Sequence, residues 1–149
     1  RIFMEPIDCP FQVGRRAVQD LKSKGATVIF VDIHAEATSE KKAMGHFLDG
    51  QVSMVVGTHT HVQTSDEEIL PGGTGYLTDA GMVGVAHSVI GVEIAPILER
   101  FLTQVPVKFD VPKKGDVLMC GVVVDIDASG RATHIQRILE RHPYAGAVR

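Results

Sequence analysis

Three histidines stand where apolar segments of the sequence give way to polar residues. His59 and His61 follow the apolar run 52–56, and His34 follows the apolar run 27–33. In an extended segment, residues two apart face the same side, so we expect the His59 and His61 imidazoles to point into one site. Neutral imidazole is the commonest protein ligand for transition metals, so this spacing predicts a metal site.

The elements that carry these histidines are expected to be a strand, a helix and a second strand. Residues 27–33 and 52–56 are apolar and rich in β-branched side chains, which predicts buried strands. Ser39 is a suitable N-cap for a helix over residues 40–48. A βαβ unit pairs its strands in parallel, so both would end at the same sheet edge and bring His34 near His59 and His61.

Polar residues beside the histidines are candidates for orienting them. Asp32 shares a strand face with His34; no further metallophosphoesterase signature follows this Asp-x-His, so we interpret Asp32 as a supporting carboxylate rather than a ligand. Thr58, directly before His59, is a second supporting candidate. Asp79 either orients a ligand histidine or caps a turn, and the sequence leaves both interpretations open. A lone histidine after a strand more often bonds locally than binds metal, so the hypothesis depends on three occurring together.

The remaining pattern predicts a mixed α/β fold in one domain, with a sheet that is parallel early and antiparallel late. We expect a helix over residues 11–24 that ends at Gly25. A second helix over 92–104 would have an apolar core stripe formed by Ile94, Ile97, Leu98, Phe101 and Leu102. Further strands are expected at residues 76–78, 107–111, 117–126 and 131–139, with a hairpin turn at 127–130.

Composition narrows the classes of function. The chain has 149 residues, 44% hydrophobic and 22% charged, and a formal net charge of −3, which suits one globular domain and excludes a disordered chain. Without a Lys/Arg block or a long apolar span, we expect neither a DNA-binding surface nor a membrane segment. Cys9 and Cys120 form no ligand or disulfide pattern, which favours a reducing, cytoplasmic location. The chain begins at Arg1 and enters an apolar segment at once, which suggests a fragment lacking its N-terminal part.

Four separated motifs resemble the YmdB-like bacterial metallophosphoesterases. They are HAEATSEK from His34, GTHTH from Gly57, TDAGM from Thr78 and SVIG from Ser88. They occur in the order expected, and the similarity covers nearly the whole chain from the DCPF segment at Asp8 to the final hairpin.

The resemblance implies a calcineurin-like sandwich of mixed sheets flanked by helices, of which residues 1–149 would be the C-terminal portion of a single domain. It also implies a dinuclear metal centre, with His34 and His59 on one metal and His61 on the other. Iron or manganese is expected, with zinc or magnesium as alternatives. The implied reaction is hydrolysis of phosphodiesters, specifically 2′,3′-cyclic nucleotides. The family's opening Asp, bridging Glu, metal-binding Asn and adjacent general-acid histidine are absent, so the catalytic acid would lie in the missing part and this fragment alone would be inactive.

Other interpretations stay open. One is a capsule-synthesis-type metallophosphatase, and another is a non-catalytic metal-binding fragment. An amidohydrolase barrel with a His-x-His motif would need many more βα units, and the antiparallel hairpin over residues 117–139 argues against it. The expected partner is a small phosphodiester or cyclic nucleotide, and a homo-oligomer is a further alternative that the sequence does not decide.

Overall fold

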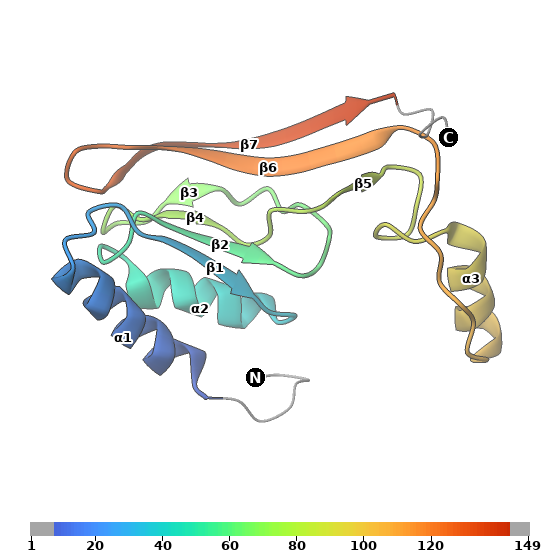
Figure 1. Ribbon diagram of the computed structural model, residues 1–149, viewed down its shortest axis with the longest axis horizontal. Helices are drawn as coiled ribbons and strands as arrows, with labels where there is room; N and C mark the ends of the chain where they lie inside the picture. The colour runs from blue at the N-terminus through green and yellow to red at the C-terminus, as the bar shows by residue number, and fades with distance from the viewer. Residues whose placement is uncertain (1–7, 144–149) are drawn as a thin grey trace.

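The computed structural model describes residues 8–143, which form a layered α/β fold (Figure 1). Helices α1 and α2 lie on one side of a four-stranded sheet, and the long β6–β7 hairpin lies on the other side. The mixed α/β class is therefore confirmed. In chain order the elements are α1 (Pro10–Ser23), β1 (Phe30–His34), α2 (Thr38–Leu48), β2 (Met54–Thr58), β3 (Glu68–Ile69), β4 (Gly75–Leu77), β5 (Val83–Val85), α3 (Ile94–Thr103), β6 (Val117–Ile126) and β7 (Ala132–His142).

The first sheet has the strand order β1-β2-β4-β3, and β1, β2 and β4 are parallel. The predicted βαβ unit is thus confirmed, although its boundaries move. Strand β1 begins three residues later than expected and ends on His34, whereas β2 ends on Thr58. Helix α2 begins at Thr38 after an Ala37 N-cap, so Ser39 lies inside the helix and the predicted N-cap is wrong.

Strand β2 is the centre of the core, because both of its faces are covered. Val55 packs with the helices, whereas Met54 and Val56 pack with side chains of the β6–β7 hairpin. Strand β1 was also predicted to be buried, but of its residues only Ile33 is buried, and Phe30 is 54% exposed. The physical reason is position: among the described residues β1 has a paired neighbour on one side only.

The C-terminal third contains the second sheet, in which β5, β6 and β7 are antiparallel. The predicted turn between β6 and β7 is confirmed, and the Asp127 side chain stabilises it by accepting hydrogen bonds from the Ser129 and Arg131 backbone N–H groups. The strand predicted at residues 107–111 is absent from the described chain, which is irregular there.

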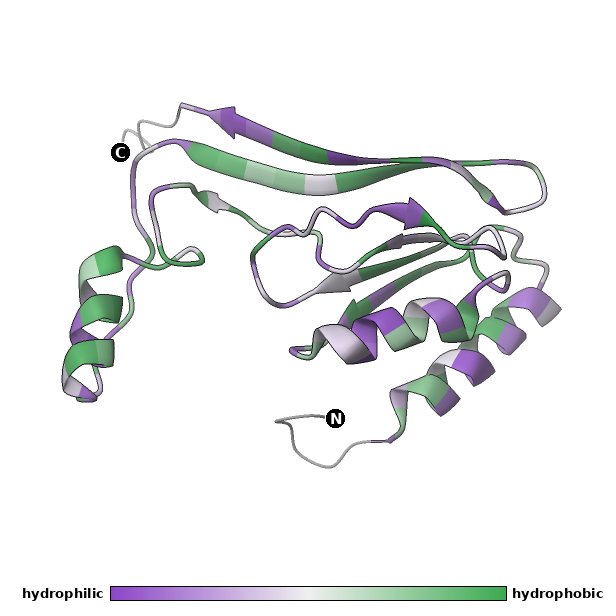
Figure 2. Cartoon of the chain, turned by 180° about the vertical axis from the view of Figure 1, so that it is seen from behind, coloured by the Kyte–Doolittle hydropathy of each residue, from purple (hydrophilic) through white to green (hydrophobic). Residues whose placement is uncertain are grey.

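Helix α3 confirms the helix predicted over residues 92–104 but not its burial. Of the five expected core residues only Ile97 is buried, whereas Leu98, Phe101 and Leu102 are 52%, 75% and 84% exposed. The helix stands apart from the layered body (Figure 1), and much of its ribbon has the green colour of hydrophobic residues (Figure 2). Over residues 8–143, no helix is both long and apolar enough to cross a bilayer.

The Gln63 side chain joins the segment after the histidines to the residues that follow β4 and to the β6–β7 hairpin. The Gln63 amide Nε2 lies 3.2 Å from the Ala80 carbonyl oxygen, 3.0 Å from that of Gly121 in β6 and 2.9 Å from that of Ile138 in β7. The loop that leaves β2 is therefore attached to the hairpin and to the segment that follows β4.

Candidate metal site

Two of the three predicted histidines meet at the carboxyl edge of the first sheet. His34 is the last residue of β1, and the strand register pairs it with Thr58, the last residue of β2. His59 follows at once, so its ring lies beside that of His34, with 4.8 Å between ring centroids. The closest approach is 3.0 Å, between His34 Nε2 and His59 Nδ1. The expected convergence of His34 and His59 is therefore present.

A chain of hydrogen bonds orients the His34 ring. The Thr58 hydroxyl donates its only proton to Asp32 Oδ1 at 2.8 Å, so its oxygen can accept the bond from His34 Nδ1, 3.1 Å away. A neutral imidazole has one N–H, and this arrangement places it on Nδ1. The His34 Nε2 atom then keeps its lone pair and faces His59. Asp32 and Thr58 thus lie in the supporting positions that the sequence suggested.

The His59 ring is held by Glu36, for which the sequence predicted no role. The Glu36 carboxylate lies 2.7 Å from His59 Nε2 and can only accept a hydrogen bond, so it places the proton of a neutral His59 on Nε2. Glu36 lies two residues after His34, just beyond the end of β1, and this position could have identified Glu36 from the sequence. The lone pair on His59 Nδ1 therefore points at the lone pair on His34 Nε2.

These two facing nitrogens fit a bound cation. With both rings neutral in these tautomers, two lone pairs would lie 3.0 Å apart, and either a bound cation or a proton on one of the two nitrogens would relieve their repulsion. Metal–imidazole bonds are about 2.1 Å long, so two such ligands at a right angle on one ion are about 3.0 Å apart. The donor chemistry and the separation thus suit a transition metal, although within residues 8–143 no three His, Cys, Asp or Glu side chains are grouped to hold one ion.

The sequence led us to expect that strand alternation would turn His61 toward this pair. The structure lacks that alternation. His59 and His61 have φ values of 109° and 64°, and the chain bends after Thr58. Alternation therefore ends before His59, and the prediction that residues 59–61 are extended is wrong. The His61 ring instead lies 2.7 Å from the Ile90 carbonyl oxygen through Nδ1, and this bond leaves Nε2 as its lone-pair nitrogen.

The Asp79 carboxylate is hydrogen-bonded to the loop that carries His59 and His61. It accepts hydrogen bonds from the backbone N–H of Thr60, which lies between the two histidines, and of Gly81. It also pairs with the Lys41 ammonium at 2.7 Å, and both side chains are completely buried. Burial raises the pKa of Asp79, but the hydrogen bonds from Lys41, Gly81 and Thr60 outweigh it and hold the pKa below its usual value of 3.8. The bond from Gly81 is a turn cap, whereas the bond from Thr60 holds the loop that carries the histidines, so both interpretations of Asp79 stay predictions.

Lys41 is a residue of this region that was not predicted from the sequence. It lies on the buried face of α2 together with Met44, Gly45 and Leu48. A lysine on the buried face of a helix could have been recognised as a residue with a charged partner, because lysine is rarely fully buried without one.

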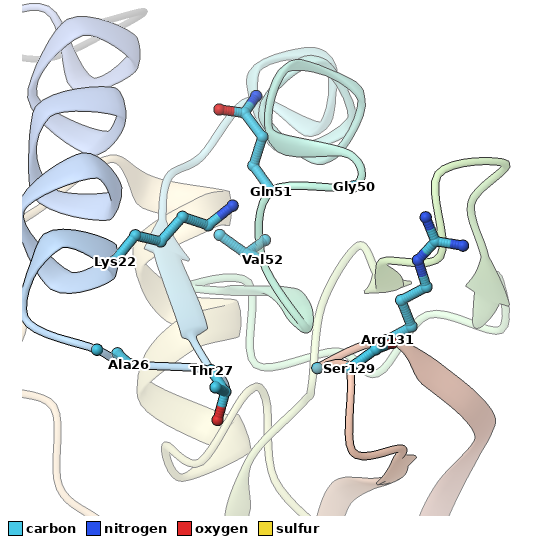
Figure 3. A pocket seen from close by; sticks show the side chains of 10 residues that line it. Lys22, Ala26, Thr27, Gly50, Gln51, Val52, Ser129 and Arg131 are labelled. Atoms are coloured by element: carbon cyan, nitrogen blue, oxygen red, sulfur yellow. The ribbon is translucent and has the colours of Figure 1, made fainter.

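The structure contains a cavity of about 740 Å³, and Figure 3 shows the side chains that line it. Its lining residues precede the first strands or belong to the hairpin turn, so it opens at the amino ends of β1 and β2, whereas the histidines lie at the carboxyl ends. It is lined by Lys22, Gly25, Ala26, Thr27, Gly50, Gln51, Val52, Ser129, Gly130 and Arg131. The candidate site is therefore an exposed sheet edge and not this cavity.

Solved structures share this arrangement of strands and helices. A hypothetical protein from Thermus thermophilus superposes with a TM-score of 0.85 and 42% identity, over 96% of this chain and 55% of that chain. A structure described as a novel phosphatase from Mycoplasma pneumoniae superposes with a TM-score of 0.82 and 30% identity, over 95% of this chain and 51% of that one. The fold is thus of a class that includes a phosphatase.

Sequence comparison narrows the class to a family. A family model described as YmdB-like protein matches residues 1–138, and the chain belongs to this family. It is 47% identical to the 2′,3′-cyclic-nucleotide 2′-phosphodiesterase of Bacillus subtilis (strain 168) over 140 residues. The matched region makes up 93% of this chain and 52% of that relative. The family resemblance is therefore confirmed, and the chain spans about half the length of the relatives it matches.

Proposed function

We propose that this chain supplies part of the active site of a metal-dependent phosphodiesterase that acts on 2′,3′-cyclic nucleotides. The observation that carries the proposal is the pair of facing ring nitrogens on His34 and His59, which are 3.0 Å apart. The Bacillus subtilis relative, named as a 2′,3′-cyclic-nucleotide phosphodiesterase, supports the choice of substrate. His34 and His59 would hold one ion of a dinuclear centre and His61 the other, with iron or manganese as the metals and further ligands from residues outside this chain.

The residues present here would hold the centre in place. Bound metal ions would stabilise charge on the phosphate and activate water at neutral pH. Asp32 and Thr58 fix the orientation of His34, Glu36 fixes that of His59, and the Ile90 carbonyl fixes that of His61. Asp79 holds the loop between the last two histidines. Each ring would thus present a lone pair without reorganisation, as a preorganised site requires.

Replacing His59 by Ala tests the proposal directly. We expect metal-dependent hydrolysis of 2′,3′-cyclic AMP by the product of the complete reading frame to fall more than about a hundredfold, because loss of even an outer partner of a ligand costs about 10- to 100-fold. The matched control is His134→Ala, since His134 is an exposed histidine on β7. Full activity in a double variant, His59→Ala with His61→Ala, would overturn the proposal.

A phosphomonoester assayed in parallel separates the second candidate function. The Mycoplasma pneumoniae structure is described as a phosphatase, so a capsule-synthesis-type metallophosphatase is the second candidate. Faster turnover of the monoester than of the cyclic diester would support that alternative. Metal binding without turnover of either substrate would support a non-catalytic metal-binding fragment.

Replacing Thr58 by Val tests the support of His34. Valine has the shape of threonine but cannot relay the bond between Asp32 and His34, so the ring loses its fixed orientation. We expect the affinity for Mn²⁺, measured by calorimetric titration, to fall about 10- to 100-fold. Thr58→Ser keeps the hydroxyl and should restore most of the affinity; equal losses in both variants would show that the hydroxyl has no such role.

A further inference from the structure

The turn that contacts His61 has a residue poorly suited to its backbone. Val89 and Val92 form an antiparallel bridge with N···O distances of 2.9 and 3.0 Å, so Ile90 and Gly91 are the two central residues of the turn. Their φ values are 47° and 95°. Positive φ at both central positions defines the type I′ turn, in which Asn-Gly is strongly preferred. A β-branched residue such as isoleucine is a genuine outlier there.

Burial of the Ile90 side chain does not offset the strain of its positive φ, because 47% of the residue is exposed. The turn itself is well braced: the Ser88 hydroxyl donates to the Val85 carbonyl and accepts from the Gly91 N–H. The bond to His61 uses only the backbone carbonyl of Ile90, which any residue would provide. Neither the turn nor the orientation of His61 therefore accounts for an isoleucine side chain.

Ile90 lies next to His61, one of the histidines of the candidate metal site. The carbonyl contact of 2.7 Å places the Ile90 backbone at the Nδ1 edge of the His61 ring. Val62, the next residue after His61, is 59% exposed. Two exposed aliphatic residues thus lie next to His61, Val62 in the sequence and Ile90 through its backbone carbonyl. Strained residues concentrate at ligand-binding sites, where the surroundings hold them in place.

We infer that Ile90 packs against the nucleobase of the substrate and so helps to select nucleotides over other phosphodiesters. The inference rests on the proposed function. The phosphate and ribose of a cyclic nucleotide are polar, so the face of the base is the part that gains from contact with an exposed aliphatic side chain. The phosphate would lie on the metal side of His61 and the base would extend past the ring toward Ile90.

Ile90→Asn is the decisive variant, because it suits the turn and removes the aliphatic group. We expect the melting temperature to rise by about 2–4 °C as the strain is relieved. With the product of the complete reading frame, we expect the ratio of kcat/KM for 2′,3′-cyclic AMP to that for base-free ribose 2′,3′-cyclic phosphate to fall about tenfold. Ile90→Gly, which also suits the turn, should give the same fall. Val83→Asn changes an exposed valine on β5 and serves as the control.

The outcomes separate the inference from the proposed function. An unchanged ratio in both Ile90 variants overturns the inference while leaving the phosphodiesterase proposal intact. A lower melting temperature in both variants also overturns it, since Ile90 would then be a packing residue. Absence of hydrolysis of both substrates by the parent protein contradicts the proposed function, and the inference with it.

Discussion

Replacing Lys41 by Met is expected to lower the free energy of unfolding by about 3–5 kcal/mol. Lys41 and Asp79 are both completely buried and lie 2.7 Å apart, so the variant leaves the Asp79 carboxylate in the protein interior without its counter-charge. Methionine is close to the lysine stem in length, so the loss arises from charge and not from a cavity. Urea denaturation of the chain measures the effect directly.

The matched control is Lys24→Met, which breaks an exposed pair of the same kind. Lys24 and Asp20 are 2.6 Å apart, but their side chains are 68% and 57% exposed. Such pairs contribute about 0–1 kcal/mol, so this variant should change stability little. Similar losses in the two variants would contradict the role given to burial. Because the pKa of Asp79 is lowered by folding, its contribution is present at neutral pH and is lost as the pH falls through the folded-state value, below 3.8.

Replacing Gly57 by Ala is expected to cost about 3 kcal/mol or more, at the upper end for overpacked sites. A Cβ atom at this position would collide with the Thr78 carbonyl oxygen, which is backbone, and would lie 2.7 Å from Lys41 Cδ. The Gly57 carbonyl also accepts a hydrogen bond of 2.8 Å from Ala80, so the two segments cannot separate without losing it. Thermal denaturation should show the loss.

Gly121→Ala is the matched control for this prediction. Gly121 lies in β6, and no neighbouring atom is within 4 Å of the position that a Cβ would occupy. The alanine there should be tolerated. Equal melting temperatures for the Gly57 and Gly121 variants would show that the close approach of the chain at Gly57 is not a constraint.

The local sequence pattern predicted the elements that follow one another directly along the chain. The apolar runs around the two parallel strands and the helix between them are enough to specify a βαβ unit, and parallel pairing then brings His34 and His59 together. The exposure of Phe30 and of the apolar stripe on α3 could not be predicted, because periodicity indicates which side chains share a face and not whether another element covers it.

The rest of the candidate site depends on backbone conformation and on long-range partners. Strand alternation predicts that His59 and His61 share a face, but both residues have positive φ, which no residue type at these positions signals. Lys41 and Asp79 are 38 residues apart, so their pairing is set by how α2 packs against the sheet. Glu36 was close enough in sequence to be found, but its role becomes evident only when the His59 ring is placed.

The three contacts of the Gln63 amide have a consequence for motion at the site. Loops that bind ligands are usually drawn from the least stable parts of a protein. Here the Gln63 amide, which has two N–H groups, lies within hydrogen-bond distance of the carbonyl groups of Ala80, Gly121 and Ile138, so displacing the segment that follows His61 requires breaking bonds to the β6–β7 hairpin. The histidine loop should therefore exchange its amide hydrogens slowly, at a rate closer to that of the strands than to that of a surface loop.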